Sequence, residues 1–497
     1  MMLVMLKSSR ATALRQSLNH PVIDADGHYI ETAPILKPFL VESVRDIAGN
    51  DLAKRVADGV AGIDYDETVL RPWSKLTDEQ RHSQWIPRPP WWSLPAANTL
   101  DRATAQLPKL MAERLDEMGI DFAVMYPSRM LTATAIQNPD LRKAVCRSLN
   151  KFYATAYEPY ADRMTPVAQI PTHTPEEAII ELEYAVNELG LKAAMINGLV
   201  HRPLNLNNNT KEGSRPNWGS TGTSRIDVLG FDSEYDYDPF WQKCIELKVV
   251  PSTHTPGMGW GSRQSPSNYM YNHIGSFAAS MDASCKGIFM GGVTKRFPQL
   301  AFGFLEGGVG WAVQLLGDII EHWEKRNRNT IRNLDPANIN LDQIMHLFDE
   351  YGDEVFRSDA SGLRESFANL EPPPPIFDEW ADCGIDSKND IVNRFVPHFY
   401  FGCEADDSSV AWAFNTKLNP LGARLRAMFS SDAGHWDVTD INEILPEAHE
   451  LVKDGHITDE DFRDFVFGFP AQFYATLNRD FFKGTRVEKE ATSLLSP

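Results

Sequence analysis

The sequence predicts an α/β fold, a (β/α)8 TIM barrel with large loop insertions. Eight short runs of apolar or β-branched residues recur along the chain, and most are followed by a helical pattern. These runs are nearly continuous in hydrophobicity, which is typical of parallel strands buried on both faces. The rival, a doubly wound open sheet, is disfavoured because the chain has no glycine-rich nucleotide-binding motif. The predicted strands are residues 22–26, 120–126, 165–170, 193–197, 249–254, 301–306, 398–403 and 427–432.

Two of the predicted helices have clear start signals. Thr174 is placed to cap a helix, and Glu177 completes a capping box three residues later. Apolar residues then recur at helical spacing until Gly190, a typical helix end. A second helix is expected to begin at Asp238, just before the strand at 249–254. This alternation of strands and helices favours the barrel.

The chain is too long for a bare barrel. A (β/α)8 barrel needs about 250 residues, whereas this chain has 497. We therefore expect insertions, of which two follow the C-terminal end of a strand and are candidate lids; surface decoration or an oligomer contact is the alternative. The insertion at 201–235 reads as a long polar loop. The predicted organisation is an extension at 1–19, one barrel domain at 20–484 with insertions at about 30–100, 201–235 and 325–396, and a tail at 485–497.

Composition excludes several classes of protein. With 48 Lys+Arg against 68 Asp+Glu, the formal net charge is −20, and no basic block is present. This argues against nucleic-acid and anionic-membrane partners and favours a small-molecule substrate. No apolar stretch approaches the roughly 18 residues that a membrane span needs. The five cysteines are dispersed, with no C-x-x-C pair, which indicates a reduced, cytoplasmic protein without a thiolate zinc site.

Polar side chains end four of the predicted strands. Asp26 and His28 are two residues apart, so on an extended chain they point to the same face. His254 ends an otherwise apolar strand, Glu306 precedes two glycines, and Asp432 ends the last strand. The C-terminal ends of barrel strands meet at one rim, where barrel active sites lie. Although Asp-x-His alone could be a capped turn, the set predicts a metal site.

The same stretches, in this order, resemble the amidohydrolase-related metal-dependent hydrolase family, in the branch typified by aminocarboxymuconate semialdehyde decarboxylase. The resemblance covers residues 20–484 and implies a barrel of the metal-dependent hydrolase type. It also implies metal ligation by Asp26, His28, His254 and Asp432. The matching stretches are VIDADGHYIE (22–31), RLDEMGIDFAVMYPS (114–128), VVPSTHTPG (249–257), RFPQLAFGFLEGGVGW (296–311) and FSSDAGHWD (429–437).

The chain departs from the family pattern at two positions. Asp26 stands where the family often has His or Glu, and this change keeps an oxygen ligand. Glu306 stands where decarboxylase-type members often place a catalytic His, which favours hydrolysis slightly over decarboxylation. The implied ligands are carboxylates and imidazoles without sulfur, so we expect one divalent ion, zinc first, with Mn, Fe or Co as alternatives.

The expected function is hydrolysis, or non-oxidative decarboxylation, of a small organic acid or related compound by metal-bound water or Lewis-acid catalysis. Asp432 either ligates the metal or accepts a proton, and His435 is a candidate proton donor. Glu306 acts as a general acid/base or orients a histidine. The alternatives are an iron-dependent oxygenase on the same barrel and a degenerate, non-catalytic barrel subunit.

Four further residues are candidates for substrate binding, each with a structural alternative. An arginine beyond the second strand could pair with a carboxylate or form a surface ion pair. Two histidines could face the pocket, and a tryptophan in a candidate lid could stack on substrate. The family resemblance also implies a homodimer or higher oligomer. The candidates are Arg129, His201, His273 and Trp260.

Overall fold

Eight parallel strands form the centre of the protein. The structure is a computed structural model that describes residues 9–58, 69–90, 94–203, 224–254, 264–373 and 378–496. The strands lie in the order β1-β2-β3-β4-β7-β8-β9-β10, and each neighbouring pair is parallel. The predicted strands are all confirmed, within a few residues at their ends. They are β1 (Ile23–Tyr29), β2 (Phe122–Pro127), β3 (Met164–Ile170), β4 (Ala193–Ile196), β7 (Pro251–Thr253), β8 (Phe302–Phe304), β9 (Phe399–Cys403) and β10 (Arg426–Phe429).

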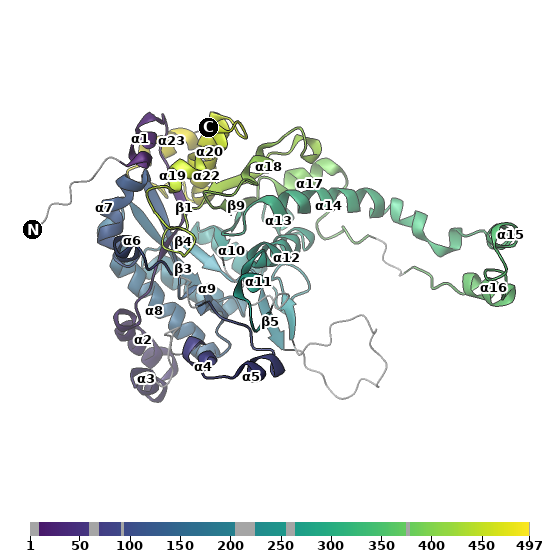
Figure 1. The fold of residues 1–497 in the computed structure, drawn as a ribbon, viewed down its shortest axis with the longest axis horizontal. Helices are drawn as coiled ribbons and strands as arrows, with labels where there is room; N and C mark the ends of the chain where they lie inside the picture. Colours follow the sequence, from purple (N-terminus) through teal and green to yellow (C-terminus); the bar gives the residue numbers. More distant parts are fainter. Residues whose placement is uncertain are drawn as a thin grey trace, which may run out of the picture.

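The sheet curves into the predicted (β/α)8 barrel, and the ends of β10 and β1 meet. The backbone N–H of Asp432 donates to the carbonyl of Asp26 at 3.1 Å, and that of Ser431 donates to the Asp24 carboxylate at 2.9 Å. Helices surround the strands (Figure 1). Strand side chains are therefore buried on both faces, which explains the continuous hydrophobic runs in the sequence.

The helices that cover the barrel follow the strands along the chain. Both predicted helix starts are confirmed: Thr174 and Glu177 form a reciprocal capping box, and a helix begins at Asp238. The helical run after Thr174 ends in a π-helical turn (Tyr184–Glu188) shortly before Gly190. The helices of the barrel layer and the C-terminal region are α7 (Pro108–Met118), α8 (Pro139–Tyr157), α9 (Pro175–Glu183), α10 (Asp238–Leu247), α11 (Tyr269–His273), α12 (Ser276–Met290), α13 (Val293–Arg296), α14 (Gly310–Arg326), α17 (Lys388–Phe395), α18 (Val410–Phe414), α19 (Ile444–Ala448), α20 (Glu450–Lys453), α21 (Asp459–Arg463), α22 (Phe469–Ala475) and α23 (Glu488–Leu495).

The insertions also carry secondary structure. The prediction of a long polar loop at 201–235 is wrong for two parts of that segment, which belong to the antiparallel strands β5 (Val200–Pro203) and β6 (Ser224–Asp227). A buried ion pair of 3.0 Å joins Arg202 of β5 to Asp227 of β6, which stand two register positions apart. Residues 204–223 lie outside the described ranges. The remaining helices are α1 (Arg10–Ser17), α2 (Ala33–Ala48), α3 (Asn50–Ala57), α4 (Arg71–Ser74), α5 (Asp78–Ser83), α6 (Thr99–Thr104), α15 (Leu341–Tyr351) and α16 (Ala360–Ala368).

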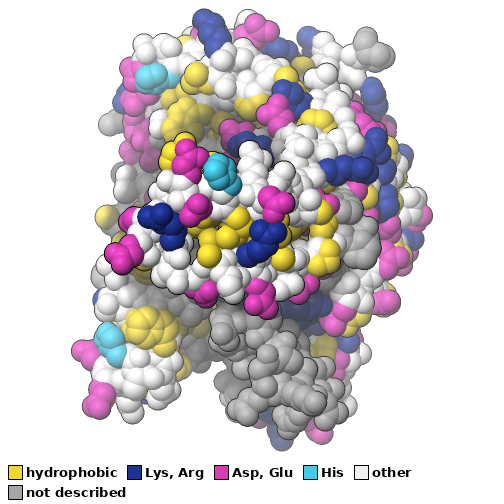
Figure 2. Space-filling view, turned by 90° about the vertical axis from the view of Figure 1, so that its right-hand side faces the viewer, with side chains coloured by type: hydrophobic (Ala, Val, Ile, Leu, Met, Phe, Trp, Pro, Cys, Tyr) yellow, Lys and Arg dark blue, Asp and Glu magenta, His cyan; other side chains and the backbone are white. Residues whose placement is uncertain are grey.

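An arm projects from the barrel beyond α14 and carries α15 and α16 at its end (Figure 1). Two tryptophans join the chain segments at its base. The Trp380 indole donates to the carbonyl of Arg326 at 3.1 Å, and the Trp323 indole donates to that of Ile385 at 3.3 Å. Figure 2 views the molecule from the side to which the arm points and shows apolar side chains among charged ones.

Two further observations concern the whole chain. No helix within the described ranges combines the length and the hydropathy needed to cross a membrane. All five cysteines are buried and carry free thiols.

Candidate active site

The C-terminal half of β1 places Asp26 and His28 inside the barrel, with exposed fractions of 1% and 0%. His28 Nδ1 lies 2.9 Å from the carbonyl of Pro127. Because a carbonyl only accepts hydrogen bonds, Nδ1 carries the proton and Nε2 carries a lone pair. Burial, with the neighbouring His435 and His254, holds the pKa of His28 well below its ordinary value. The imidazole is therefore neutral.

The lone pair of His28 faces nitrogen and oxygen atoms from other strand ends. Its Nε2 lies 3.2 Å from Nε2 of His254 and 3.0 Å from Oδ1 of Asp432. His254, directly after β7, also places Nε2 3.2 Å from the Asp26 carboxylate and 3.3 Å from that of Glu306. The strand ends thus converge as the sequence analysis expected, and the five side chains form one buried cluster.

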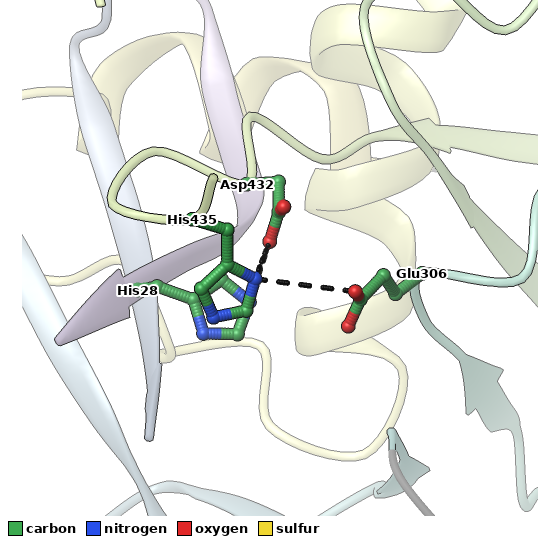
Figure 3. Close-up of side chains that lie close together, drawn as sticks. All are labelled: His28, Glu306, Asp432 and His435. Carbon is green, nitrogen blue, oxygen red and sulfur yellow. Dashed lines mark ion pairs between the residues drawn. The ribbon is translucent and has the colours of Figure 1, made fainter. Parts of the chain in front are cut away.

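Glu306 and Asp432 both have left-handed backbone conformations, with φ of 60° and 49°. Such conformations are uncommon for residues with a side chain, cost on the order of 1–3 kcal/mol each and gather at functional sites. They turn the two carboxylates toward His435 (Figure 3). Nδ1 of His435 lies 2.6 Å from Asp432 Oδ1 and 3.9 Å from Glu306 Oε1. The His435 ring packs on His28, with 3.8 Å between ring centroids.

The electrostatics of the cluster disfavour charge on any of these groups. Burial, together with Glu404, Asp26 and Asp437, raises the pKa of Glu306 well above its ordinary value. The pKa of Asp432 is likewise raised well above its ordinary value by burial and by nearby carboxylates. Burial, with His254 and His273, lowers the pKa of His435 to about 3. A cation bound in the cluster would stabilise the ionised carboxylates and so reduce this electrostatic cost.

The donor atoms fit a divalent cation. Among the residues that the structure describes, Oδ1 of Asp26, Oε2 of Glu306 and both carboxylate oxygens of Asp432 are buried without a hydrogen-bond partner. Buried carboxylate oxygens without a partner are costly unless a cation or donor faces them. Two sets that share His28 have ligand atoms mutually within 4.8 Å: Asp26, His28 and His254, and His28, Glu306, Asp432 and His435. Asp26 and Asp432 thus belong to different sets. Nitrogen and oxygen donors in these sets suit Zn, Mn, Fe or Co.

The other candidate residues occupy different surroundings. Arg129 follows β2, and its backbone N–H donates to Glu31 at 2.8 Å. His201 lies on β5, with its Nε2 buried and without a partner within the described part of the chain. His273 ends α11 with its ring edge toward Trp436, 6.0 Å between centroids. Trp260 lies outside the described residues. Substrate binding by these residues stays a prediction.

The sequence analysis assigned no role to Glu404 and Asp437, which lie beside Asp432 with ligand atoms mutually within 4.8 Å. A signal for Glu404 was present, because it directly follows the predicted strand at 398–403. Asp437 ends a stretch that carries the family resemblance. Burial, together with Asp437 and other carboxylates, raises the pKa of Glu404 to about 8. The buried cluster therefore continues into a second, all-carboxylate group.

A (β/α)8 barrel with imidazoles and carboxylates converging at its strand ends defines the class of metal-dependent barrel enzymes. The sequence profile described as "Amidohydrolase" matches residues 23–334, which is more than half of the chain. The protein therefore belongs to the amidohydrolase family, and the family resemblance in the sequence is confirmed. The matched range contains Asp26, His28, His254 and Glu306, whereas Asp432 lies beyond it.

Solved structures show a similar fold at low sequence identity. The chain is similar to an amidohydrolase from Mycobacterium avium subsp. paratuberculosis K-10, with 12% identity, a TM-score of 0.51 and coverage of 92% of this chain and 100% of the other. It is also similar to a dihydroxybenzoic acid decarboxylase from Polaromonas sp. JS666 with bound manganese and 2-nitroresorcinol (17% identity, TM-score 0.46, coverage 93% and 99%). A third similar structure is 4-oxalomesaconate hydratase from Rhodopseudomonas palustris, with 13% identity, a TM-score of 0.44 and coverage of 92% of this chain and 96% of the other. The first supports the barrel fold, and the reaction must be argued from the site.

Proposed function

We propose that the protein is a metal-dependent enzyme that hydrolyses a small organic acid or related compound. One divalent cation, zinc before Mn, Fe or Co, would be held by Asp26, His28, His254 and Asp432. The observation that carries this proposal is the lone pair of His28 Nε2. It lies 3.2 Å from a second imidazole nitrogen and 3.0 Å from a carboxylate oxygen, so nitrogen and oxygen donors of three strand ends converge where one cation could be bound.

The residues around this cation supply both a base and an acid. When bound, the cation would supply Lewis acidity at the bond to be cleaved. Asp432 is placed to accept a proton from water, and the neutral imidazole of His435, 2.6 Å from Asp432, is placed to relay it. Glu306, whose pKa is raised well above its ordinary value, is able to hold a proton and release it to a leaving group.

This pairing favours hydrolysis over its rival. Hydrolysis needs a base to accept a proton from water and an acid to protonate the leaving group, whereas non-oxidative decarboxylation needs only an acid at the carbon left behind. Glu306 alone could serve decarboxylation, so this reaction is the second candidate. A neutral imidazole beside it gives hydrolysis the fuller set of groups.

Metal content tests the site directly. We expect Asp26→Ala and His254→Ala each to lose the bound metal in elemental analysis while keeping the far-UV circular dichroism of the folded barrel. His398→Ala is the matched control, because His398 is a buried histidine that lies just before β9, away from the cluster, with Nδ1 2.8 Å from the carbonyl of Leu300. Full metal occupancy in both site variants would refute the proposal.

Turnover of candidate substrates separates the reactions. We expect zinc-loaded protein to cleave members of a panel of amides, lactones and substituted organic acids without releasing CO2 and without consuming O2. Release of CO2 would assign decarboxylation instead. Activity that needs iron and O2 would assign an oxygenase, and a preparation that binds no stoichiometric metal would favour a non-catalytic subunit.

We further propose a cytoplasmic homodimer or higher oligomer that acts on a small molecule. Five unpaired, buried thiols support the reducing compartment. The exposed apolar side chains of the arm support self-association, and size-exclusion chromatography with light scattering tests it. A monomer at micromolar concentration would contradict the oligomer.

A further inference from the structure

A strongly acidic cavity adjoins the candidate active site. It has a volume of about 270 Å³ and lies between the segments that follow β9 and β10 and the helices α19 and α20. Its lining includes seven carboxylate side chains and no Lys, Arg or His. Acidic side chains around a cavity do not by themselves make a binding site. A cation site also requires carboxylate oxygens that lie close enough together to bind one ion.

Two of the carboxylates that line the cavity lie together with Asp432, which is next to the lining residue Ser431. Ligand oxygens of Glu404, Asp432 and Asp437 lie within 4.8 Å of one another. Glu404 follows β9, whereas Asp432 and Asp437 belong to the turn that follows β10, so neighbouring strand ends hold the group. Like charges at this separation repel strongly when they are partly removed from water.

The carboxylate of Asp432 provides a further indication of a ligand. Its side chain is 1% exposed, and neither carboxylate oxygen has a hydrogen-bond partner among the residues that the structure describes. Its Oδ1 faces the imidazoles of His28 and His435. Its Oδ2 and Oδ1 of Asp437 are also buried, and outside this group of three neither has a hydrogen-bond partner in the described part of the chain. These oxygens are therefore available on the side of Glu404 and Asp437.

We propose that Glu404, Asp432 and Asp437 bind a second divalent cation of the oxygen-preferring class, Mg²⁺, Ca²⁺ or Mn²⁺. The three ligands are all carboxylates, which these hard cations prefer, whereas the first site also contains imidazoles. The cavity gives room for the waters that such cations retain. Asp432 lies between the two sites and contributes to both. The second ion would also place a positive charge in a cavity whose lining has none.

Manganese binding to zinc-loaded, full-length protein tests the proposal. Free Mn²⁺ is followed by its electron paramagnetic resonance signal during titration, and zinc content is measured before and after. We expect the wild type to bind one Mn²⁺ while keeping its zinc. Glu404→Gln and Asp437→Asn should each weaken Mn²⁺ binding at least tenfold and keep zinc. Millimolar Mg²⁺ or Ca²⁺ should displace the Mn²⁺.

Glu447→Gln is the matched control, because Glu447 lines the same cavity but lies outside the group of three. We expect its Mn²⁺ affinity to equal that of the wild type. Equal weakening in Glu447→Gln and Glu404→Gln, or a wild type that binds zinc but no Mn²⁺, would overturn the second site. If the wild type binds no zinc but still binds one Mn²⁺, and Glu404→Gln weakens that binding, the second site is supported and only the first site is contradicted.

Discussion

Glu306 combines an unfavourable backbone conformation with burial of an unpartnered carboxyl oxygen, a combination that is typical of functional positions. Its backbone φ is 60°, and Oε2 is buried without a hydrogen-bond partner in the described chain. In chelator-treated protein we expect Glu306→Gln to raise the free energy of unfolding by about 1–3 kcal/mol, because the amide needs no proton, whereas the buried carboxyl takes up a proton that the unfolded chain has released at neutral pH. The same variant should lose at least about 100-fold in turnover if the residue is an acid/base group.

Urea unfolding with and without EDTA, together with turnover, measures both effects. Glu306→Asp is the informative companion, since it keeps the carboxyl group and shortens the side chain. Lower stability of Glu306→Gln in EDTA would show that the carboxylate stabilises the metal-free fold, contrary to the expectation.

Glu31 should give the fold a measurable pH dependence. Its carboxylate accepts hydrogen bonds from Tyr153 at 2.6 Å and from the backbone of Arg129 at 2.8 Å, and burial raises its pKa to about 7 from 4.5. Between these two values the folded chain holds a proton that the unfolded chain has released. Stability therefore falls as pH rises from 4.5 to 7, by on the order of 3 kcal/mol for this group.

We expect Glu31→Gln to remove this part of the slope when unfolding by urea is measured across pH 4.5–8. Asp24, whose pKa burial also raises to about 7, contributes in the same direction and remains in the variant. The difference between wild type and variant isolates Glu31. An unchanged slope, or a difference that grows more favourable to the wild type with rising pH, would contradict the assignment.

For single residues, the sequence predicted the location of those side chains that stand at the ends of strands. Asp26, His28 and His254 could be placed together because strand ends of a barrel meet at one rim. The left-handed conformations of Glu306 and Asp432 could not be anticipated, because they depend on how each turn is held by the rest of the barrel. Asp437 follows the last strand by several residues, and no local sequence pattern predicts that the turn brings its side chain next to Asp432.

At the scale of elements, the start of α9 combines a local capping interaction with a long-range ion pair. Thr174 accepts from the Glu177 backbone at 3.2 Å, so Thr174→Ala should cost about 1 kcal/mol of stability. Glu177 also forms a buried ion pair of 2.9 Å with Arg142, so Glu177→Ala should cost about 3–5 kcal/mol. Urea unfolding of both variants checks the ratio, and equal costs would show that the ion pair adds nothing.

The β5–β6 hairpin shows the opposite case at the same scale. Its segment is polar and rich in Gly, Ser and Asn, so local propensity indicates a loop. The strands form because Arg202, 25 positions before Asp227 in the chain, meets it in a buried site and also donates to the Tyr237 hydroxyl at 2.9 Å. Pairing over that distance leaves no periodic signal in the sequence, whereas the capping box at Thr174 is complete within four residues.

At the scale of the whole molecule, we expect the barrel to fold without the arm. It is held together internally, with Phe348 and Phe367 at 5.9 Å between ring centroids, and the tryptophans at its base join the two chain segments. Val355 and Phe356 expose 75% and 62% of their surface, which is unusual for apolar residues without a partner. The arm therefore suits self-association better than folding of the barrel.

Replacing residues 340–370 with a short Gly/Ser linker should accordingly leave metal content and the unfolding transition of the barrel unchanged, because the strands, the buried cluster and the tryptophans at the base are all retained. The same truncation should reduce the size of the oligomer measured by light scattering, since it removes the exposed apolar surface. Val355→Ser with Phe356→Ser in the full-length chain is the finer test, and it should weaken association without shortening the chain. Loss of metal or of cooperative unfolding in the truncated protein would show that the arm belongs to the fold, and an unchanged oligomer would show that association uses another face.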